Sequence, residues 1–258
     1  MEKTEFLKYA KQAAREAADV LESWSKKFTV SEKSRANLVT EADFAAQQAI
    51  HDILQSQFPD HGFLGEEDLE IANGDSPYRW VIDPLDGTSN YVHRFPYYAV
   101  SIALECDKEL IVGVIYDPNR DEMFTAIHGE GAHLNGAPIR PTGVTAIEEA
   151  MVVASLPVHV GPNDVAVKRF LRVLSKAQTV QRTGSAALNL CYVAAGRMDA
   201  YFSTSLKPWD MAAGALIVSE AGGCVGTLDG KPLKIEVPDL LACNGTQLRE
   251  QLTPLLVQ

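Results

Sequence analysis

The segment 80–90 constrains this chain more than any other part of its sequence. It reads Trp-Val-Ile-Asp-Pro-Leu-Asp-Gly-Thr-Ser-Asn, so an apolar run typical of a buried strand leads into two carboxylates, a proline and a glycine. Pro84 favours an extended Asp83 and fixes the turn that follows, which brings Asp86 round beside Asp83. The segment therefore predicts a short strand, 79–82, that stops at a sharp turn where two carboxylates meet and the Leu85 carbonyl points outward.

This turn offers hard oxygen donors. Two carboxylates and one carbonyl suit Mg²⁺, which prefers oxygen ligands and keeps some of its waters. Gly87 allows a close backbone approach, and the N–H groups of residues 88–90, expected at a helix start, suit a phosphate group. Asp, Pro and Gly are also common turn residues. The loop alone therefore leaves two interpretations open, a plain turn and a site for metal and phosphate.

Other acidic residues occur where the chain changes direction. Taken alone, the run Glu66–Asp68 is typical of a solvated acidic turn. Asp210 is typical of a carboxylate that the dipole favours at a helix start, and Asp43 of a capping box with Thr40. Each of these residues has a structural explanation that needs no function.

Several enzyme classes conflict with the motifs. Phospho-aspartate phosphatases carry two aspartates at i and i+2 beyond a strand, whereas Asp83 and Asp86 are at i and i+3. This spacing argues against covalent catalysis by Asp83. The sequence contains no GxxxxGK[ST], which argues against a P-loop kinase, and no GxSxG, which removes the simplest serine hydrolase.

Charge and cysteine content limit the partners. The chain has 258 residues, with 34 acidic and 23 basic side chains, and a formal net charge of −11. This charge argues against a nucleic-acid polymer or an acidic membrane as partner, because both repel an acidic protein. An anionic substrate remains compatible if cations reverse the local charge. The four distant cysteines, the lack of an apolar span and the charged N-terminus predict reduced thiols in a cytoplasmic protein.

The hydrophobic pattern predicts alternating helices and strands. Helices are expected at 6–24, from Thr40 to Phe58, and at 164–174, 186–195, 208–220 and 246–256. Further strands are expected at 98–105, 110–116, 122–127, 151–154, 179–181, 199–202 and 240–243, with an ordered loop at 31–37 and a tight turn at Asn135-Gly136. Because no linker divides the chain, we expect one domain, 1–258, with subregions 1–140 and 141–258.

Four sets of residues, in chain order, resemble the inositol monophosphatase family of lithium-sensitive, Mg²⁺-dependent phosphomonoesterases. They are Leu38–Asp43, Gly65–Glu67 with Trp80–Tyr91, Arg182–Ala186, and Trp209–Gly214 with Glu220–Gly223. The resemblance implies an α+β fold, a layered α-β-α-β-α sandwich with mixed sheets. It also implies a homodimer that binds two or three Mg²⁺ ions per subunit and hydrolyses a small phosphomonoester with a metal-activated water that attacks in line.

The resemblance further implies individual roles. Glu66, Asp83 and the Leu85 carbonyl would bind the first Mg²⁺; Asp83, Asp86 and Asp210 would bind the second; a third ion would lie near Glu66 and Glu67. The catalytic residues would be Asp43, Glu66 and Thr88. The substrate-binding residues would be Glu66, Leu85, Asp86, Gly87, Thr88, Gly184, Ser185, Ala186, Ser203 and Asp210.

One departure from the family pattern concerns the substrate. Inositol-specific members carry a glutamate that contacts inositol at the position of Ser203, and a hydroxyl is shorter and uncharged. Loss of such a contact is worth about 1–3 kcal/mol. This departure weakens selectivity for inositol without touching the metal chemistry. Inositol 1-phosphate or a related polyol or sugar phosphate remains the first expectation from the family resemblance. Histidinol phosphate, a nucleotide 3′-phosphate, fructose bisphosphate and a non-catalytic subunit that binds phosphate or metal remain alternatives.

Overall fold

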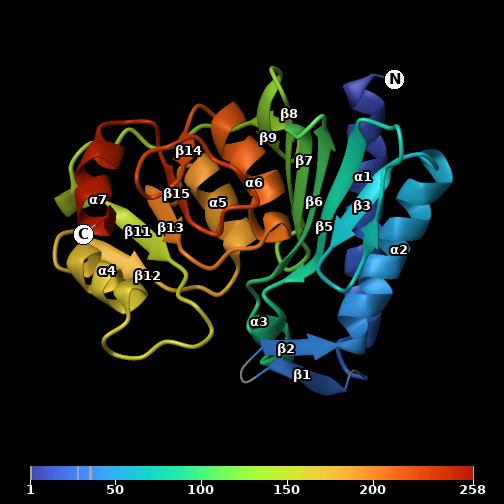
Figure 1. Cartoon of the computed structure of the whole chain (residues 1–258), viewed down its shortest axis with the longest axis horizontal. Coiled ribbons are helices and arrows are strands. Elements are labelled where there is room, and N and C mark those ends of the chain that lie inside the picture. The colour runs from blue at the N-terminus through green and yellow to red at the C-terminus, as the bar shows by residue number, and fades with distance from the viewer. Residues whose placement is uncertain (1, 28, 35–36, 258) are drawn as a thin grey trace.

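The computed structural model describes residues 2–27, 29–34 and 37–257, and of residues 32–34, 37 and 38 the backbone alone. Figure 1 shows its layers: a helix pair, a large sheet, a second helix pair, a smaller sheet and an outer helix pair. This arrangement confirms the layered α-β-α-β-α sandwich with mixed sheets that the family resemblance implies.

The first layer consists of helices α1 (Lys3–Trp24) and α2 (Glu41–Gln57). Helix α1 buries a row of mostly small side chains, namely Phe6, Ala10, Ala13, Ala14, Ala17, Ala18 and Leu21. Small residues allow α2 and the large sheet to approach closely. The predicted cap of α2 is confirmed, because the Thr40 hydroxyl accepts from the Ala42 N–H at 3.2 Å and Asp43 accepts from the Thr40 N–H at 2.9 Å.

The large sheet has the strand order β10-β9-β8-β7-β6-β5-β3-β4. The strands are β3 (Gly62–Gly65), β4 (Glu70–Ile71), β5 (Tyr78–Asp86), β6 (Ala99–Cys106), β7 (Glu109–Asp117), β8 (Glu122–Ile127), β9 (Gly131–Leu134) and β10 (Ala137–Pro138). All neighbours pair antiparallel except β3 and β5, which are parallel. The predicted hairpin β6–β7 and the tight turn at Asn135-Gly136, with φ of 49° and 84°, are confirmed.

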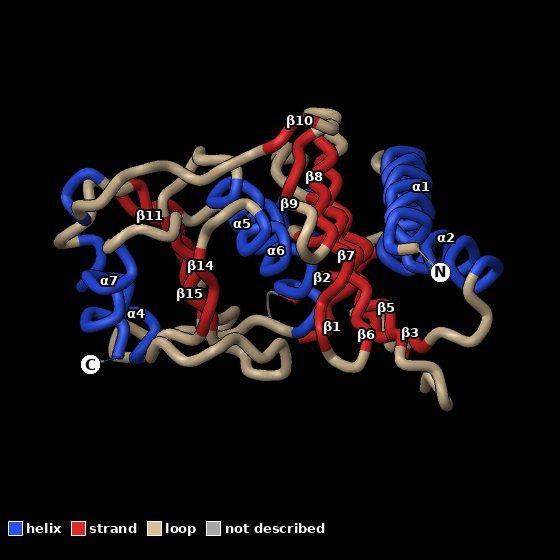
Figure 2. Tube along the Cα trace, turned by 90° about the horizontal axis from the view of Figure 1, so that it is seen from above, coloured by secondary structure: helices blue, strands red, loops and turns tan. Residues whose placement is uncertain are grey.

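The second half of the chain builds the other three layers. Helices α5 (Ala186–Ala194) and α6 (Pro208–Glu220) are buried on nearly every side, because they lie between the two sheets, as Figure 2 shows. The smaller sheet has the order β12-β11-β13-β15-β14. Its strands are β11 (Met151–Ala154), β12 (Thr179–Gln181), β13 (Ala200–Ser203), β14 (Cys224–Gly226) and β15 (Leu240–Cys243); α4 (Val165–Leu174), α7 (Leu248–Val257) and a 3₁₀ helix (Ile147–Glu149) lie outside it.

Two expectations from the sequence are wrong. The segment 31–37, expected as a loop, contains strand β1 (Val30–Ser34) and the start of β2 (Asn37–Thr40), which pair antiparallel; residues 35 and 36 lie outside the described residues. These strands form because their backbones pair with each other. The polar sequence has no alternating hydrophobic pattern that would predict them. Strand β5 does not stop at Ile82 but continues to Asp86, because a register shift against β6 between Asp83 and Asp86 accommodates the proline.

The shortest elements have no signal in the sequence. Strands β3, β4 and β14 have two to four residues each, too few for a periodic pattern. Helix α7 begins at Leu248, two residues later than expected, and β13 is shifted by one residue to Ala200–Ser203. The division into subregions stays a prediction, although the large sheet ends at Pro138 and the smaller one begins at Met151. Among the described residues, no helix combines the length and apolar character that a membrane crossing requires.

Candidate active site

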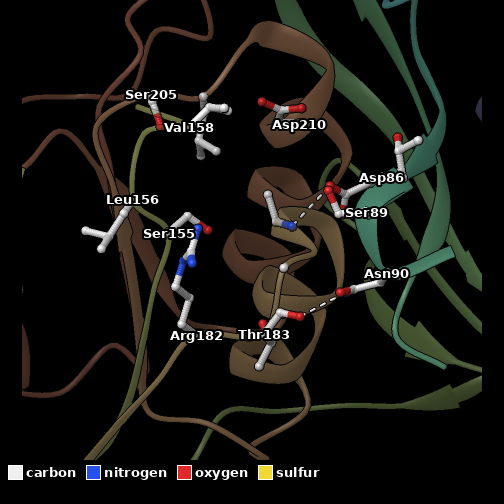
Figure 3. Close-up of a pocket in the computed structure, with 15 residues that line it drawn as sticks. Asp86, Ser89, Asn90, Ser155, Leu156, Val158, Arg182, Thr183, Ser205 and Asp210 are labelled. Atoms are coloured by element: carbon white, nitrogen blue, oxygen red, sulfur yellow. Dashed lines mark hydrogen bonds between the residues drawn. The ribbon is translucent and has the colours of Figure 1, made fainter. Parts of the chain in front are cut away.

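Three aspartates meet at the end of β5. Asp83 and Asp86 flank the register shift in β5, and Asp210 belongs to the first turn of α6. Each aspartate offers a carboxylate oxygen, and the three oxygens lie within 4.8 Å of one another. Figure 3 shows Asp86 and Asp210 directed toward the same space. Residues far apart in the sequence thus form one acidic cluster, here called the carboxylate cluster.

Glu66 adds its charge to the carboxylate cluster. It follows β3, which runs parallel to β5, so the carboxyl ends of both strands lie at the same edge of the sheet. The Glu66 N–H donates to the Ile82 carbonyl at 3.2 Å, and the Glu66 charge raises the pKa of Asp83 and Asp210. The buried Gln47 amide holds the next residue, because it binds the N–H and carbonyl of Glu67 at 3.0 and 2.8 Å.

Burial and mutual repulsion disfavour ionisation of these aspartates. Burial, followed by neighbouring carboxylates, raises the pKa of Asp83 and Asp210 well above the usual range. Burial also raises the pKa of Asp86 to about 6, although three hydrogen bonds oppose the shift. Buried carboxylates packed together require a positive charge to be stable in ionised form. The donors are all hard oxygens, so this cluster could bind a metal, and its chemistry suits Mg²⁺.

Asp86 is held by the start of α5. Its carboxylate accepts hydrogen bonds from the Ser185 hydroxyl, from the Ala186 N–H at 3.2 Å and from the Ala187 N–H at 2.7 Å. The Ser185 oxygen also accepts from the Leu188 N–H at 3.2 Å and thereby caps the helix. These contacts fix the orientation of Asp86 relative to the central helix layer.

Asp43 connects the α2 cap with the turn after β5. The Thr88 hydroxyl lies 3.2 Å from Asp43 Oδ1 and 3.2 Å from the Leu85 carbonyl oxygen, and it can donate its proton to either. Asp43 is 1% exposed, and burial raises the pKa of its carboxyl. A Thr88 hydroxyl beside a buried carboxylate of raised pKa can relay a proton.

A pocket of about 520 Å³ opens beside the carboxylate cluster. Its lining residues are Asp86, Gly87, Thr88, Ser89, Asn90, Ser155, Leu156, Val158, Arg182, Thr183, Gly184, Ala186, Ser205, Leu206 and Asp210. Figure 3 shows two sides, here called the acidic wall, with Asp86 and Asp210, and the polar wall, with Ser155, Arg182 and Ser205. The first wall comes from the large sheet and α6, and the second from the smaller sheet.

The pocket brings together only some of the residues that the sequence predicts for the site. Those that line it are Asp86, Gly87, Thr88, Gly184, Ala186 and Asp210; those outside the lining are Asp43, Glu66, Asp83, Leu85, Ser185 and Ser203. Asp43, Asp83 and Leu85 are buried. Ser185 and Ser203 are both 0% exposed, so neither hydroxyl faces the pocket space. Their predicted contact with substrate stays a prediction.

Sequence reasoning missed the polar wall. Strands β11, β12 and β13 are parallel, and Ser155, Arg182 and Ser205 follow their carboxyl ends. Ligands commonly bind at that edge of parallel strands. The three strands were predicted, but their shared direction was not, and that direction is the signal that would have identified this wall.

Asn90 connects the segment after β5 with the segment that precedes α5. Its Nδ2 donates to the carbonyl of Tyr97 at 2.7 Å and to that of Thr183 at 2.9 Å. Gly184 adopts φ +92°, and a Cβ there would lie 2.9 Å from Asn90 Nδ2. Glycine is thus required for the chain 182–184 to pass this close to α3 (Thr88–Val92).

The layered fold and the carboxylate cluster beside a polar pocket define the class of metal-dependent phosphomonoesterases that the sequence resembles. The model of the Inositol monophosphatase family matches residues 2–258. The chain therefore belongs to the inositol monophosphatase family, whose homologues are phosphomonoester hydrolases.

Individual relatives agree with this assignment. Inositol monophosphatase 2 of Solanum lycopersicum is 41% identical over 253 residues, which cover 93% of this chain and 94% of that protein. Nus factor SuhB of Pseudomonas aeruginosa is 38% identical over 257 residues, with 96% and 95% covered. The crystal structure of extragenic suppressor protein suhB from Bartonella henselae matches with a TM-score of 0.93 at 36% identity, covering 98% of this chain and 99% of that one.

Proposed function

We propose that this protein is a Mg²⁺-dependent phosphomonoesterase that hydrolyses inositol 1-phosphate or a related polyol or sugar phosphate. The observation that carries the proposal is the meeting of Asp83, Asp86 and Asp210 within 4.8 Å beside the pocket. A relative with 41% identity bears the name inositol monophosphatase, which supports the choice of inositol phosphate as first substrate.

The carboxylates would hold the metal ions. Glu66, Asp83 and the Leu85 carbonyl would share one Mg²⁺, and Asp83, Asp86 and Asp210 a second; a third would lie near Glu66 and Glu67. Bound Mg²⁺ lowers the pKa of water and neutralises charge on the attacking and leaving oxygens. The chain's own contribution is to fix Asp86 through Ser185 and the start of α5, so that the donor set is in place before substrate arrives.

The protein would also move a proton. The Thr88 hydroxyl would accept a proton from the attacking water while it donates its own proton to Asp43 Oδ1, 3.2 Å away. The raised pKa of Asp43 makes this carboxylate a better proton acceptor than an exposed aspartate. The backbone of Gly87 and Thr88 would hold the phosphate, and Gly184 and Ala186 with the polar wall would face the alcohol.

A substrate panel tests the proposal. Purified protein should release phosphate from inositol 1-phosphate, a sugar phosphate, histidinol phosphate, a nucleotide 3′-phosphate or fructose bisphosphate when Mg²⁺ is present. EDTA should abolish release, and Li⁺ should inhibit it. If Asp86→Asn keeps near-wild-type turnover on the best substrate, the assignment of the metal ligands is wrong.

The proposal extends to assembly and compartment. A homodimer and a cytoplasmic location remain part of it, and the four free cysteines support a reducing compartment. Sedimentation analysis of the full chain at micromolar concentration tests the dimer.

A second candidate function is a binding role without hydrolysis. The observation that favours it is the name of a 38% identical relative, Nus factor SuhB. Freshly purified, Mg²⁺-loaded protein that releases no phosphate from any panel member would favour this candidate over the first.

A further inference from the structure

Cys224 and Cys243 lie directly opposite each other on the antiparallel strands β14 and β15. Both are free cysteines, and their thiols are hydrogen-bonded to each other. Directly opposed residues in antiparallel pairs have Cα atoms about 4.5–5.5 Å apart. Disulfides span Cα distances of about 4.4–6.8 Å. A bond between the two sulfurs therefore requires little movement of the backbone.

The two thiols have different surroundings. Cys224 is half-buried on β14, the edge strand of the smaller sheet, whereas Cys243 is 0% exposed on the neighbouring strand. The hydrogen bond from Cys243, the Arg249 charge and the backbone N–H of Gly245 lower the pKa of Cys224 to about 6 despite burial. The hydrogen bond to Cys224, followed by burial, raises the pKa of Cys243. A half-buried thiol of lowered pKa thus contacts a fully buried thiol of raised pKa.

We propose that Cys224 and Cys243 form an oxidisable dithiol site that a hydroperoxide converts into a disulfide. In the first step the Cys224 sulfur attacks the peroxide, the O–O bond breaks, and Cys224 becomes a sulfenic acid while hydroxide leaves. In the second step the Cys243 sulfur attacks the Cys224 sulfur, the S–O bond breaks, and the leaving hydroxide combines with the Cys243 proton as water. Two thiols and one hydrogen peroxide give one disulfide and two waters, and a dithiol reductant reverses the change.

The other cysteines serve as internal controls. Cys106 is half-buried like Cys224, but it lies opposite Tyr78 and Glu109 rather than a cysteine. Cys191 is buried in α5, and burial raises the pKa of its thiol well above the usual range. The proposed site lies beyond the C-terminal end of α6, whose first turn carries Asp210, and does not depend on phosphatase activity.

Peptide mapping of the native full chain tests the site. The protein is treated with hydrogen peroxide at pH 7, blocked with N-ethylmaleimide and cleaved with trypsin, which separates the two cysteines at Lys234. We expect one linked pair of peptides that joins residues 224 and 243 and disappears with dithiothreitol. At pH 7, iodoacetamide should modify Cys224 about tenfold faster than Cys106, because the hydrogen bond from Cys243 and the Arg249 charge lower the pKa of Cys224.

Variants separate the two steps. In Cys243→Ser the sulfenic acid on Cys224 should persist and be trapped by dimedone, in Cys224→Ser no adduct should form, and Cys106→Ser should behave like the wild type. The proposal is overturned if peroxide oxidises Cys106 while residues 224 and 243 stay reduced. It is also overturned if the linked peptides appear only after unfolding in urea.

Discussion

The acidic wall and the polar wall of the pocket differ in how their side chains are held. On the acidic wall, Asp86 is 8% exposed and accepts three hydrogen bonds from the start of α5. On the polar wall, Arg182 and Ser205 are exposed and follow strand ends in connecting segments. Fixed groups suit charge stabilisation in a reaction, and side chains at strand ends can change between relatives without disturbing the fold. Under the proposed function, we therefore expect the reaction at the acidic wall and substrate choice at the polar wall.

The largest effect is expected from removing a carboxylate of the cluster that includes the acidic wall, namely Asp83. Asp83→Asn should lower kcat by about a thousandfold or more, since loss of a metal-binding charge removes several kcal/mol of transition-state stabilisation. Phosphate release at saturating Mg²⁺ measures the effect. Asp52→Asn on the exposed face of α2 is the matched control and should keep wild-type turnover. Equal turnover in the two variants would contradict the assignment of chemistry to the carboxylate cluster.

Without metal, ionisation of the buried Asp86 carboxyl should lower the free energy of unfolding. Folding raises the pKa of Asp86 from its usual 3.8 to about 6, so the folded state favours the protonated form. The cost is absent below pH 3.8 and complete above about pH 6, where it amounts to about 3 kcal/mol. In EDTA, Asp86→Asn should therefore gain unfolding free energy relative to wild type as pH rises from 4 to 7.

Urea unfolding at several pH values measures this difference. Saturating Mg²⁺ should stabilise the wild type at pH 7 and stabilise Asp86→Asn much less. If the difference in unfolding free energy between the two metal-free proteins stays constant with pH, burial does not raise the pKa of Asp86.

Local constraints in the sequence predicted one part of the carboxylate cluster. Asp83 and Asp86 are close in the chain, and Pro84 restricts the backbone that joins them. Asp210 and Glu66 have no such constraint, and only the resemblance to the family assigned them to the same site. The structure adds the reason they meet, namely the shared edge of β3 and β5 and the placement of α6 against the large sheet.

The polar wall could not be predicted in this way. It depends on β11, β12 and β13 running in one direction, which is a tertiary property that no short window of sequence encodes. Ser203 lies at the end of β13 and is completely buried, which the sequence did not indicate, and its contact with substrate stays a prediction. The polar hairpin β1–β2 was not predicted for a related reason. Its strands are defined by pairing with each other and not by a hydrophobic pattern in the sequence.

An intermediate effect is expected at Ser185, which donates a hydrogen bond to Asp86 but does not line the pocket. Ser185→Ala removes one hydrogen bond to Asp86 and the cap of α5, so it should lower kcat about tenfold and the unfolding free energy by about 1 kcal/mol. Thr246→Ala is the matched control, because Thr246 accepts from the Leu248 N–H at 3.2 Å at the start of α7. This control should lose similar stability and keep its kcat. Equal kcat values in the two variants would remove the positioning role of Ser185.

The smallest effect is expected on the polar wall, and it should depend on the substrate. Arg182→Ala should raise KM about fivefold for the best polyol phosphate, equivalent to about 1 kcal/mol, with kcat within about twofold of wild type. Ser203→Ala, on the same sheet but fully buried, should change KM by less than about twofold. Steady-state kinetics on inositol 1-phosphate and on a smaller phosphomonoester such as glycerol phosphate measure both variants. If Ser203→Ala raises KM more than Arg182→Ala does, the alcohol is recognised through the buried strand β13. The assignment of substrate choice to the polar wall is then wrong.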